Sequence, residues 1–293
     1  MESISGRAGK MTLRELLLIG KKELQEANVP DGDYDAWILM EHVFKIEKSY
    51  YFLHGNDKIE EEQAKTYLAC IQKRKQRIPL QHITECAWFM GYEFYVNSNV
   101  LTPRFDTEIL VDEVSKRLKP NMKILDVCTG SGCILLSLLA EYKQWNLTGV
   151  GVDISPDALW VARKNNERLG TNAEFFESDL FSKVEEMSDR TYDIIVSNPP
   201  YIATAELEGL MPEVREHEPR IALDGKEDGL YFYREIVKQA GEFLRAGGFI
   251  CFEIGYDQGD ALKELLLAHG YEDVRIEKDL AGLDRVAIGR KHF

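Results

Sequence analysis

The chain is poor in cysteine and has no long apolar run, and each absence excludes a class of protein. The cysteines stand apart, without a C-x-x-C pair, at Cys70, Cys86, Cys128, Cys133 and Cys251. We therefore expect neither a metal site nor a disulfide framework, but reduced thiols in the cytoplasm. No apolar stretch approaches the length of a membrane span and nothing resembles a signal peptide, so we expect no membrane partner.

Positive charge is also scarce. The 293 residues include 50 acidic and 36 basic side chains, which gives a net charge of −14. Tight, sequence-independent binding to nucleic acid needs an extended basic face. This balance leaves room for a local basic patch, but we expect no direct nucleic-acid binding.

The common phosphate-binding glycine motifs are missing as well, although a glycine loop is present. Residues 123–127 form an apolar run typical of a strand, and Cys128-Thr129-Gly130-Ser131-Gly132 follows before a helical pattern. The loop is neither G-x-G-x-x-G nor a P-loop. Gly130 and Gly132 would let the backbone pass close to a ligand and would place a helix N-terminus beside it. We therefore expect a ligand without phosphate groups.

An acidic residue follows the next predicted strand. Residues 147–152 end in Asp153, about twenty residues past the glycine loop, where a carboxylate can accept hydrogen bonds from both ribose hydroxyls of a nucleoside. Capping of the helix after Pro156 is the alternative role, which Ser155 could fill instead. A ribose-binding acid beside a loop without phosphate ligands favours S-adenosylmethionine as the cofactor.

Asn198-Pro199-Pro200-Tyr201 closes a third apolar run, residues 192–197. The two prolines have no N–H to donate, so a strand must end there. The Asn198 carboxamide oxygen and the Pro199 carbonyl can accept the two hydrogens of a planar amino group, while the Tyr201 ring packs on its face. Acceptors held out of the plane would favour the pyramidal nitrogen of a methyl-transfer transition state. A strand-ending turn with a chance asparagine is the alternative.

Together, in this order, the three features predict a methyltransferase that acts on an amide or exocyclic amine nitrogen. We expect direct in-line transfer without a metal or a covalent intermediate. Two alternatives stay open: a nucleic-acid methyltransferase of the adenine N6 type acting on a flipped base, and a methyltransferase fold that only binds a partner.

Alternating strand and helix patterns from residue 123 onward predict a mostly parallel sheet covered on both faces. Strands are expected near residues 123–128, 147–153, 173–178, 192–197 and 248–254, and an antiparallel pair at 274–277 and 284–289. Residues 202–229 form a long charged loop, which we expect to be a lid or substrate clamp. The basic cluster at residues 73–77 is expected to be a solvated helix end.

The chain resembles the peptide chain release factor glutamine methyltransferases, the PrmC/HemK family, over nearly its whole length. The resemblance is carried, besides the glycine loop and the Asn-Pro-Pro-Tyr segment, by Ile78-Pro79-Leu80-Gln81-His82-Ile83-Thr84, Val100-Leu101-Thr102-Pro103-Arg104-Phe105-Asp106-Thr107-Glu108 and Glu218-Pro219-Arg220-Ile221-Ala222-Leu223.

The resemblance implies an α/β fold: a seven-stranded Rossmann-like S-adenosylmethionine-dependent methyltransferase domain with a small N-terminal helical domain of five helices. The residues themselves predict the domain bounds: the small polar start before Met11 indicates a leader or expression-tag remnant over residues 1–11, helical spacing a helical domain over 12–78, alternation around Met90-Gly91 a linker with a β-hairpin over 79–105, and the strand and helix patterns the methyltransferase domain over 106–293. The resemblance implies that the helical domain docks the substrate. The methyl acceptor would be the glutamine of the Gly-Gly-Gln tip of class I release factors, and the product S-adenosylhomocysteine.

The resemblance also assigns site residues. Cofactor contacts would come from Cys128, Thr129, Gly130, Ser131, Gly132, Asp153, Asp179, Leu180 and Asn198, with Asp179 and Leu180 beside the adenine. The glutamine amide would contact Asn198, Pro199, Pro200 and Tyr201, of which Asn198, Pro199 and Tyr201 are the catalytic candidates.

The chain departs from the family pattern at four positions. Cys128 and Glu85 stand where glycine is usual, Phe105 replaces a common proline, and Leu180 replaces an aromatic residue beside the adenine. None of these changes removes a chemical group that the reaction needs.

Overall fold

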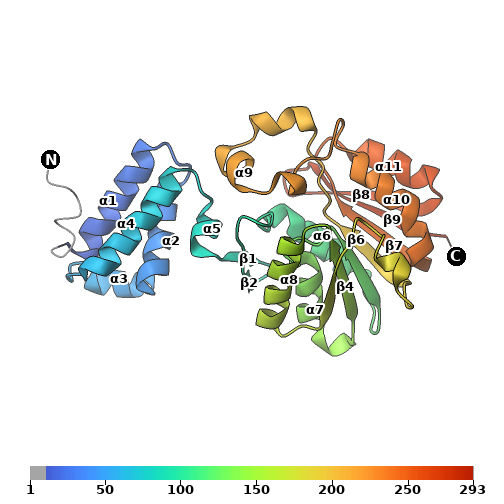
Figure 1. Cartoon of the computed structure of the whole chain (residues 1–293), viewed down its shortest axis with the longest axis horizontal. Coiled ribbons are helices and arrows are strands. Elements are labelled where there is room, and N and C mark those ends of the chain that lie inside the picture. Colours follow the sequence, from blue (N-terminus) through green and yellow to red (C-terminus); the bar gives the residue numbers. More distant parts are fainter. Residues whose placement is uncertain (1–10, 293) are drawn as a thin grey trace. The chain divides into compact units, whose positions relative to one another are not determined.

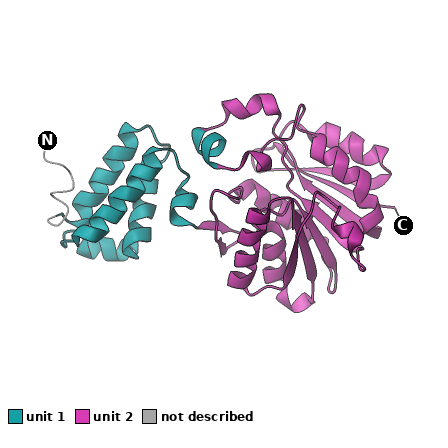
Figure 2. Ribbon diagram, in the orientation of Figure 1, with its two compact units in different colours: residues 1–85, 212–217 teal, residues 86–211, 218–293 magenta. Residues whose placement is uncertain are grey.

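The computed structural model describes residues 11–292 (Figure 1), so the predicted leader or tag remnant lies outside the described residues except for Met11. The described chain forms two units, coloured separately in Figure 2. The helical unit comprises residues up to Glu85 together with Pro212–His217, and the sheet unit comprises Cys86–Met211 and the chain from Glu218 onward.

The helical unit contains short helices packed around an apolar core. Its elements are α1 (Leu13–Glu26), α2 (Gly32–Phe44), α3 (Lys48–His54), α4 (Glu61–Lys75), α5 (Leu80–Thr84) and α9 (Pro212–His217). Thr12 caps α1: its hydroxyl accepts from the Glu15 N–H, and Glu15 accepts from the Thr12 N–H. Leu16, Leu24 and Met40 are fully buried in the core.

Buried charges join α9 to α4 within this unit. The Arg74 guanidinium donates to Asp35 at 2.7 Å and to Glu213 at 2.9 Å. Arg77 donates to both Glu213 oxygens, at 2.6 and 2.7 Å. The prediction of a solvated helix end is therefore wrong for these two arginines, because their partners lie far away in the sequence, one of them in α9.

The sheet unit is built on seven strands in the order β5-β4-β3-β6-β7-β9-β8. The strands are β3 (Lys123–Val127), β4 (Thr148–Asp153), β5 (Ala173–Glu177), β6 (Tyr192–Ser197), β7 (Leu244–Glu253), β8 (Tyr271–Lys278) and β9 (Asp284–Lys291). β9 alone runs opposite to the other six strands of this sheet; it lies between β7 and β8 and pairs antiparallel with both. The predicted fold class and the antiparallel pair at the end of the chain are confirmed.

Helices cover both faces of the sheet because the strand side chains alternate between two apolar layers (Figure 1). Ile124 and Ile194 pack in one layer, with α6 (Phe105–Ser115), α7 (Cys133–Glu141) and α8 (Pro156–Leu169). Leu125 and Ile195 pack in the other, with α10 (Tyr231–Phe243) and α11 (Gly259–Ala268). The strands therefore read as continuous apolar runs, as buried parallel strands do.

The remaining elements are short. A hairpin, β1 (Ala87–Phe89) with β2 (Tyr92–Phe94), turns at Met90 and Gly91, both of which have positive φ. The 3-10 helices are η3 (Lys143–Trp145), η4 (Val184–Glu186), η5 (Thr204–Gly209) and η6 (Arg220–Ala222). Between residues 11 and 292, no helix is both long and apolar enough to cross a membrane.

Candidate functional site

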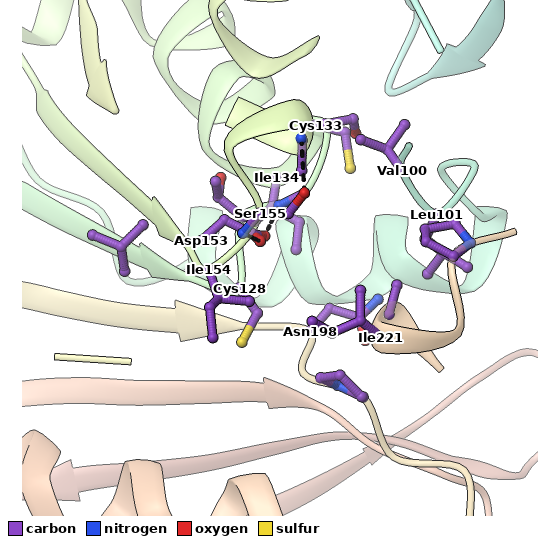
Figure 3. Close-up of a pocket in the computed structure, with 18 of the residues that line it drawn as sticks. Val100, Leu101, Cys128, Cys133, Ile134, Asp153, Ile154, Ser155, Asn198 and Ile221 are labelled. Atoms are coloured by element: carbon purple, nitrogen blue, oxygen red, sulfur yellow. Dashed lines mark hydrogen bonds between the residues drawn. The ribbon is translucent and has the colours of Figure 1, made fainter. Parts of the chain in front are cut away.

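A cavity of about 250 Å³ lies in the sheet unit, where β3, β4, β5 and β6 end (Figure 3). β3 has β4 on one side and β6 on the other, so the chain order reverses here and leaves a crevice at the carboxyl ends of the strands. The lining residues that directly follow these strands are Cys128, Thr129, Gly130, Ser131, Ile154, Ser155, Ser178, Asp179, Leu180, Asn198 and Pro200, together with Asp153, the last residue of β4.

The glycine loop after β3 takes up left-handed backbone three times. Cys128, Gly130 and Gly132 have φ of 60°, 54° and 78°. Around Gly130 nothing lies within 4 Å of the place where a Cβ would stand, whereas at Gly132 a Cβ would meet Leu136 at 2.9 Å. Gly130 therefore leaves its backbone open to a ligand, and Gly132 allows the close packing that starts α7.

Asp126, within β3, accepts a hydrogen bond from this loop. Its Oδ2 accepts from the Thr129 hydroxyl at 2.6 Å, and the side chain is fully buried. Burial, with a smaller contribution from the nearby Asp153, raises the pKa of Asp126 to about 7. Asp126 therefore changes its charge near neutral pH in the folded protein.

Asp153 at the end of β4 joins two loops. Its Oδ2 accepts from the Gly130 N–H and its Oδ1 from the Ser155 N–H, both at 2.9 Å. Desolvation raises the pKa of Asp153 although these backbone hydrogen bonds lower it. Ser155, not Asp153, caps α8 by accepting from the Ala158 N–H. Because each carboxylate oxygen can accept a second hydrogen bond, Asp153 retains acceptor capacity toward the cavity.

The Asn198-Pro199-Pro200-Tyr201 segment ends β6 as predicted, since β6 stops at Ser197. Asn198 is half-buried and lines the cavity, and its Nδ2 donates to the Thr107 hydroxyl at 3.5 Å. The Tyr201 hydroxyl donates to Glu253 Oε1 at 3.2 Å, and burial raises the pKa of Tyr201. Glu253, at the end of β7, is itself buried.

The structure thus brings most of the predicted site residues around one cavity. Its lining includes Cys128, Thr129, Gly130, Ser131, Asp153, Asp179, Leu180, Asn198 and Pro200. Gly132, Pro199 and Tyr201 stand next to lining residues in the sequence and are not part of the lining. In the described part of the chain, no cluster of three or more His, Cys, Asp or Glu side chains could hold a metal ion.

One wall of the cavity was not predicted as part of the site. It consists of residues 99–104 with Thr107, Pro219, Ile221, Ala222, Lys226 and Phe232. Glu218 ties its two segments together, accepting from Arg104 at 2.8 Å and from the Thr102 N–H at 3.3 Å. Both segments belong to stretches that carry the family resemblance. Nothing else in the sequence marked these segments as candidates for the site. The pairing itself depends on residues more than a hundred positions apart.

Solved structures share this architecture. A methyltransferase from Pyrococcus furiosus superimposes with a TM-score of 0.50 at 16% identity, over 69% of this chain and 90% of that one. The hMettl16 catalytic domain, solved with an RNA hairpin, gives 0.53 at 17% identity, over 79% of this chain and 82% of that one. The sheet unit therefore has the fold of S-adenosylmethionine-dependent methyltransferases.

Sequence relatives narrow this class. The PrmC N-terminal domain family matches residues 15–84, and the methyltransferase small domain family matches residues 102–213. A release factor glutamine methyltransferase of Geobacter sulfurreducens is 37% identical, over 95% of this chain and 96% of its own length. One from Clostridium acetobutylicum is 38% identical, over 95% and 98%. The chain belongs to the release factor glutamine methyltransferase family.

Proposed function

We propose that this chain transfers a methyl group from S-adenosylmethionine to the side-chain amide nitrogen of the glutamine in the Gly-Gly-Gln motif of class I peptide chain release factors. The observation that carries the proposal is that Asn198 shares one cavity with the glycine loop and Asp153, in a chain whose named relatives match it almost from end to end. A substrate that works on ribosomes would also account for a cytoplasmic location.

The residues around the cavity fit the cofactor. Gly130 offers open backbone, and the Asp153 carboxylate retains acceptor capacity that a ribose hydroxyl could use. Asp179 and Leu180 would flank the adenine, with Leu180 giving aliphatic packing in place of a stacked ring. Bound S-adenosylmethionine would supply a methyl group on a positively charged sulfur.

Asn198 and Pro199 would hold the glutamine amide. An amide nitrogen is a weak nucleophile while its lone pair is delocalised, and two oxygen acceptors outside the amide plane would favour the pyramidal nitrogen of the transition state. Tyr201 would pack against the amide, with its hydroxyl fixed on Glu253. A general base is not needed, because the methylated nitrogen loses its proton readily.

Docking of the release factor would involve the helical unit. Its exposed apolar side chains include Leu18, Tyr34, Phe52 and Leu53, which are 60%, 59%, 75% and 83% exposed. Tyr34 and Phe52 line one hollow on the surface of this unit, and an exposed apolar patch can serve as an interaction surface. Binding energy gained there could orient the Gly-Gly-Gln tip at the catalytic cavity.

The test is to incubate the protein with isotopically labelled S-adenosylmethionine and a purified class I release factor, and to map the label by tandem mass spectrometry. The proposal predicts one methyl group, on the side-chain nitrogen of the Gly-Gly-Gln glutamine. A label found only on added RNA or DNA would favour the nucleic-acid alternative. S-adenosylmethionine binding without transfer to any acceptor would favour a module that only binds.

A further inference from the structure

The Asn198-Pro199-Pro200-Tyr201 segment depends on both of its ends for its position. Its two prolines have no N–H, so no backbone hydrogen bond can be donated from the middle of the segment. Before it, Ser197 ends β6, and the Ser197 hydroxyl donates to the Val127 carbonyl at 2.5 Å. The position of the segment therefore depends as well on what binds its other end, at Tyr201.

Gln258, the residue that precedes α11, binds the Tyr201 carbonyl. Gln258 is 9% exposed, and its Nε2 donates to the Tyr201 carbonyl at 3.0 Å and to the Gly229 carbonyl at 3.4 Å. Its Oε1 accepts from the Gly255 N–H at 2.9 Å. Both hydrogens of the side-chain amide and its oxygen are thus used, and the reverse orientation would place an oxygen against two carbonyl oxygens. Gln258 can therefore bind Tyr201 in one orientation only.

Two glycines of the charged loop, residues 202–229, lie against the Tyr201 backbone. A Cβ at Gly225 would meet the Tyr201 Cα at 2.8 Å, and one at Gly229, where φ is 73°, would collide with the Tyr201 carbonyl oxygen. The Ile202 N–H donates to the Leu223 carbonyl at 3.1 Å, and the Gly225 N–H donates to the Ile202 carbonyl at 2.8 Å. Close packing and hydrogen bonds thus fix the backbone at this end of the segment.

We propose that Gln258 is a positioning residue, which binds the Tyr201 carbonyl and thereby keeps the Pro199 carbonyl and the Tyr201 ring in place for the substrate amide. The inference rests on the proposed function, which makes the Pro199 carbonyl an acceptor for that amide. Pro200, between the two, has a fixed φ, so part of any movement at Tyr201 is passed on to Pro199. The proposal goes further than that function because it assigns a role to a side chain outside the cavity lining.

The first experiment removes the side-chain amide of Gln258 and keeps the length of the side chain. Gln258→Met should lower kcat for an intact release factor by about tenfold, the effect of one lost hydrogen bond. This kcat is expressed per S-adenosylmethionine-binding site, counted by calorimetry. KM and the S-adenosylmethionine affinity should stay within about twofold. The matched control is Gln239→Met, because the Gln239 amide donates within α10, to the Glu235 carbonyl; its kcat should not change.

Counting binding sites separates positioning from stability, because a variant that is only less stable loses sites and keeps its kcat per site. Unchanged kcat per site in Gln258→Met would overturn the proposal, as would a loss of S-adenosylmethionine affinity as large as the loss in kcat. Gln258→Glu, assayed where the new carboxyl group is ionised, keeps an acceptor for the Gly255 N–H but has no hydrogen to donate. It carries the same expectation and replaces the methionine variant should that one not fold.

A measurement without substrate distinguishes this inference from the proposed function. Tyr201-Ile202 is the only Tyr-Ile pair in the sequence, so a heavy isotope at the carbonyl carbon of tyrosine and another at the nitrogen of isoleucine give one shared NMR signal. Its carbonyl shift should move upfield in Gln258→Met, because the oxygen loses a hydrogen bond, and stay in place in Gln239→Met. An unmoved signal in Gln258→Met would contradict the proposal even if the protein methylates release factors. Failure of the unaltered protein to methylate them would refute the proposed function alone.

Discussion

Two carboxyl groups on neighbouring strands, those of Asp126 and Asp153, accept hydrogen bonds from different residues of the glycine loop. Asp126 binds the Thr129 side chain, and Asp153 binds the Gly130 backbone. Both are desolvated, and burial, with a smaller contribution from the charge of Asp153, raises the pKa of Asp126 to about 7.

Replacing Asp153 by alanine should weaken S-adenosylmethionine binding. The change removes a charged acceptor for the ribose and also the hydrogen bond to the Gly130 N–H, each worth on the order of 1.5–3 kcal/mol. Calorimetry should record a Kd that rises by at least about tenfold, with little change in KM for the release factor. Asp157→Ala, an exposed acid in the first turn of α8, is the matched control. Unchanged affinity in Asp153→Ala would mean that the ribose lies elsewhere.

The stability of the protein should depend on pH through Asp126. The unfolded chain releases this proton near the ordinary pKa of 3.8, and the folded protein near pH 7. The stabilising contribution of the protonated group is therefore complete below the unfolded pKa and is lost as the pH rises toward 7. Urea unfolding of Asp126→Asn and of the unaltered protein should show the variant gaining by up to about 1.4 kcal/mol per pH unit over this range. A difference independent of pH would contradict the assignment.

At the scale of elements, left-handed backbone explains why glycine would suit two positions at which the chain departs from the family pattern. Cys128 and Glu85 stand where glycine is usual, and both have positive φ, 60° and 54°. Glu85 ends α5 as its C-cap, with its N–H donating to the Gln81 carbonyl. Glycine takes up this conformation without the penalty that a Cβ imposes.

Replacing Glu85 by glycine should therefore stabilise the protein. The side chain is exposed, so little packing is lost, and relief of the left-handed strain is worth about 1 kcal/mol. The free energy of unfolding in urea is the measurement. Glu85→Ala keeps a Cβ in the same backbone conformation and should gain nothing. A glycine variant no more stable than the alanine variant would show that the strain is not there.

The sequence predicts those elements whose signal is local. Residues 123–127 and 192–197 are apolar runs ended by glycine or proline, and the structure has strands at those bounds. Helix α3 (Lys48–His54) has no buried residue, so it left no apolar stripe to recognise and was implied only by the family resemblance. The insertion of β9 between β7 and β8 depends on long-range pairing, which no local pattern encodes.

The site residues at strand ends could be predicted from the sequence, whereas those that tertiary contacts bring to the cavity could not. Asn198 and the glycine loop stand at strand ends, where a parallel sheet gathers them. Thr107 looks ordinary in the sequence, and it joins the cavity only because α6 brings its hydroxyl to Asn198. The cavity wall in which Glu218 accepts a hydrogen bond from Arg104 likewise depends on tertiary structure.

At the scale of the whole molecule, the chain leaves the sheet unit at Met211, adds α9 to the helical unit and returns at Glu218. Glu213 in α9 is bound by Arg74 and Arg77, and the Arg77 hydrogen bond helps to hold its pKa low despite burial. Deleting residues 12–78 would strip Glu213 of both partners, and losing the partners of a buried charge is costly. Such a deletion would therefore disturb the loop as well as any docking surface.

Point substitutions on the exposed apolar surface of the helical unit test docking more cleanly. The double change Phe52→Ser with Leu53→Ser should raise KM for an intact release factor by about tenfold, because contacts that anchor an interface are lost. Activity on a short Gly-Gly-Gln peptide should stay the same, since the peptide carries none of the release factor surface that would dock on the helical unit. Leu280→Ser, at a fully exposed leucine between β8 and β9, is the control. An equal KM for the intact factor in all three proteins would remove the docking role.

The central claim is that the Asn198 cavity recognises a glutamine amide presented by a release factor. The most direct measurement compares kcat/KM for an intact class I release factor, for the same factor with Gly-Gly-Asn in place of Gly-Gly-Gln, and for an RNA rich in unpaired adenine, all with the same labelled methyl donor. Shortening the side chain by one methylene withdraws the amide from the acceptors, so the account predicts efficient transfer to the first substrate and a loss of at least about a hundredfold for the other two. Comparable transfer to the Gly-Gly-Asn factor, or faster transfer to the RNA, would contradict it.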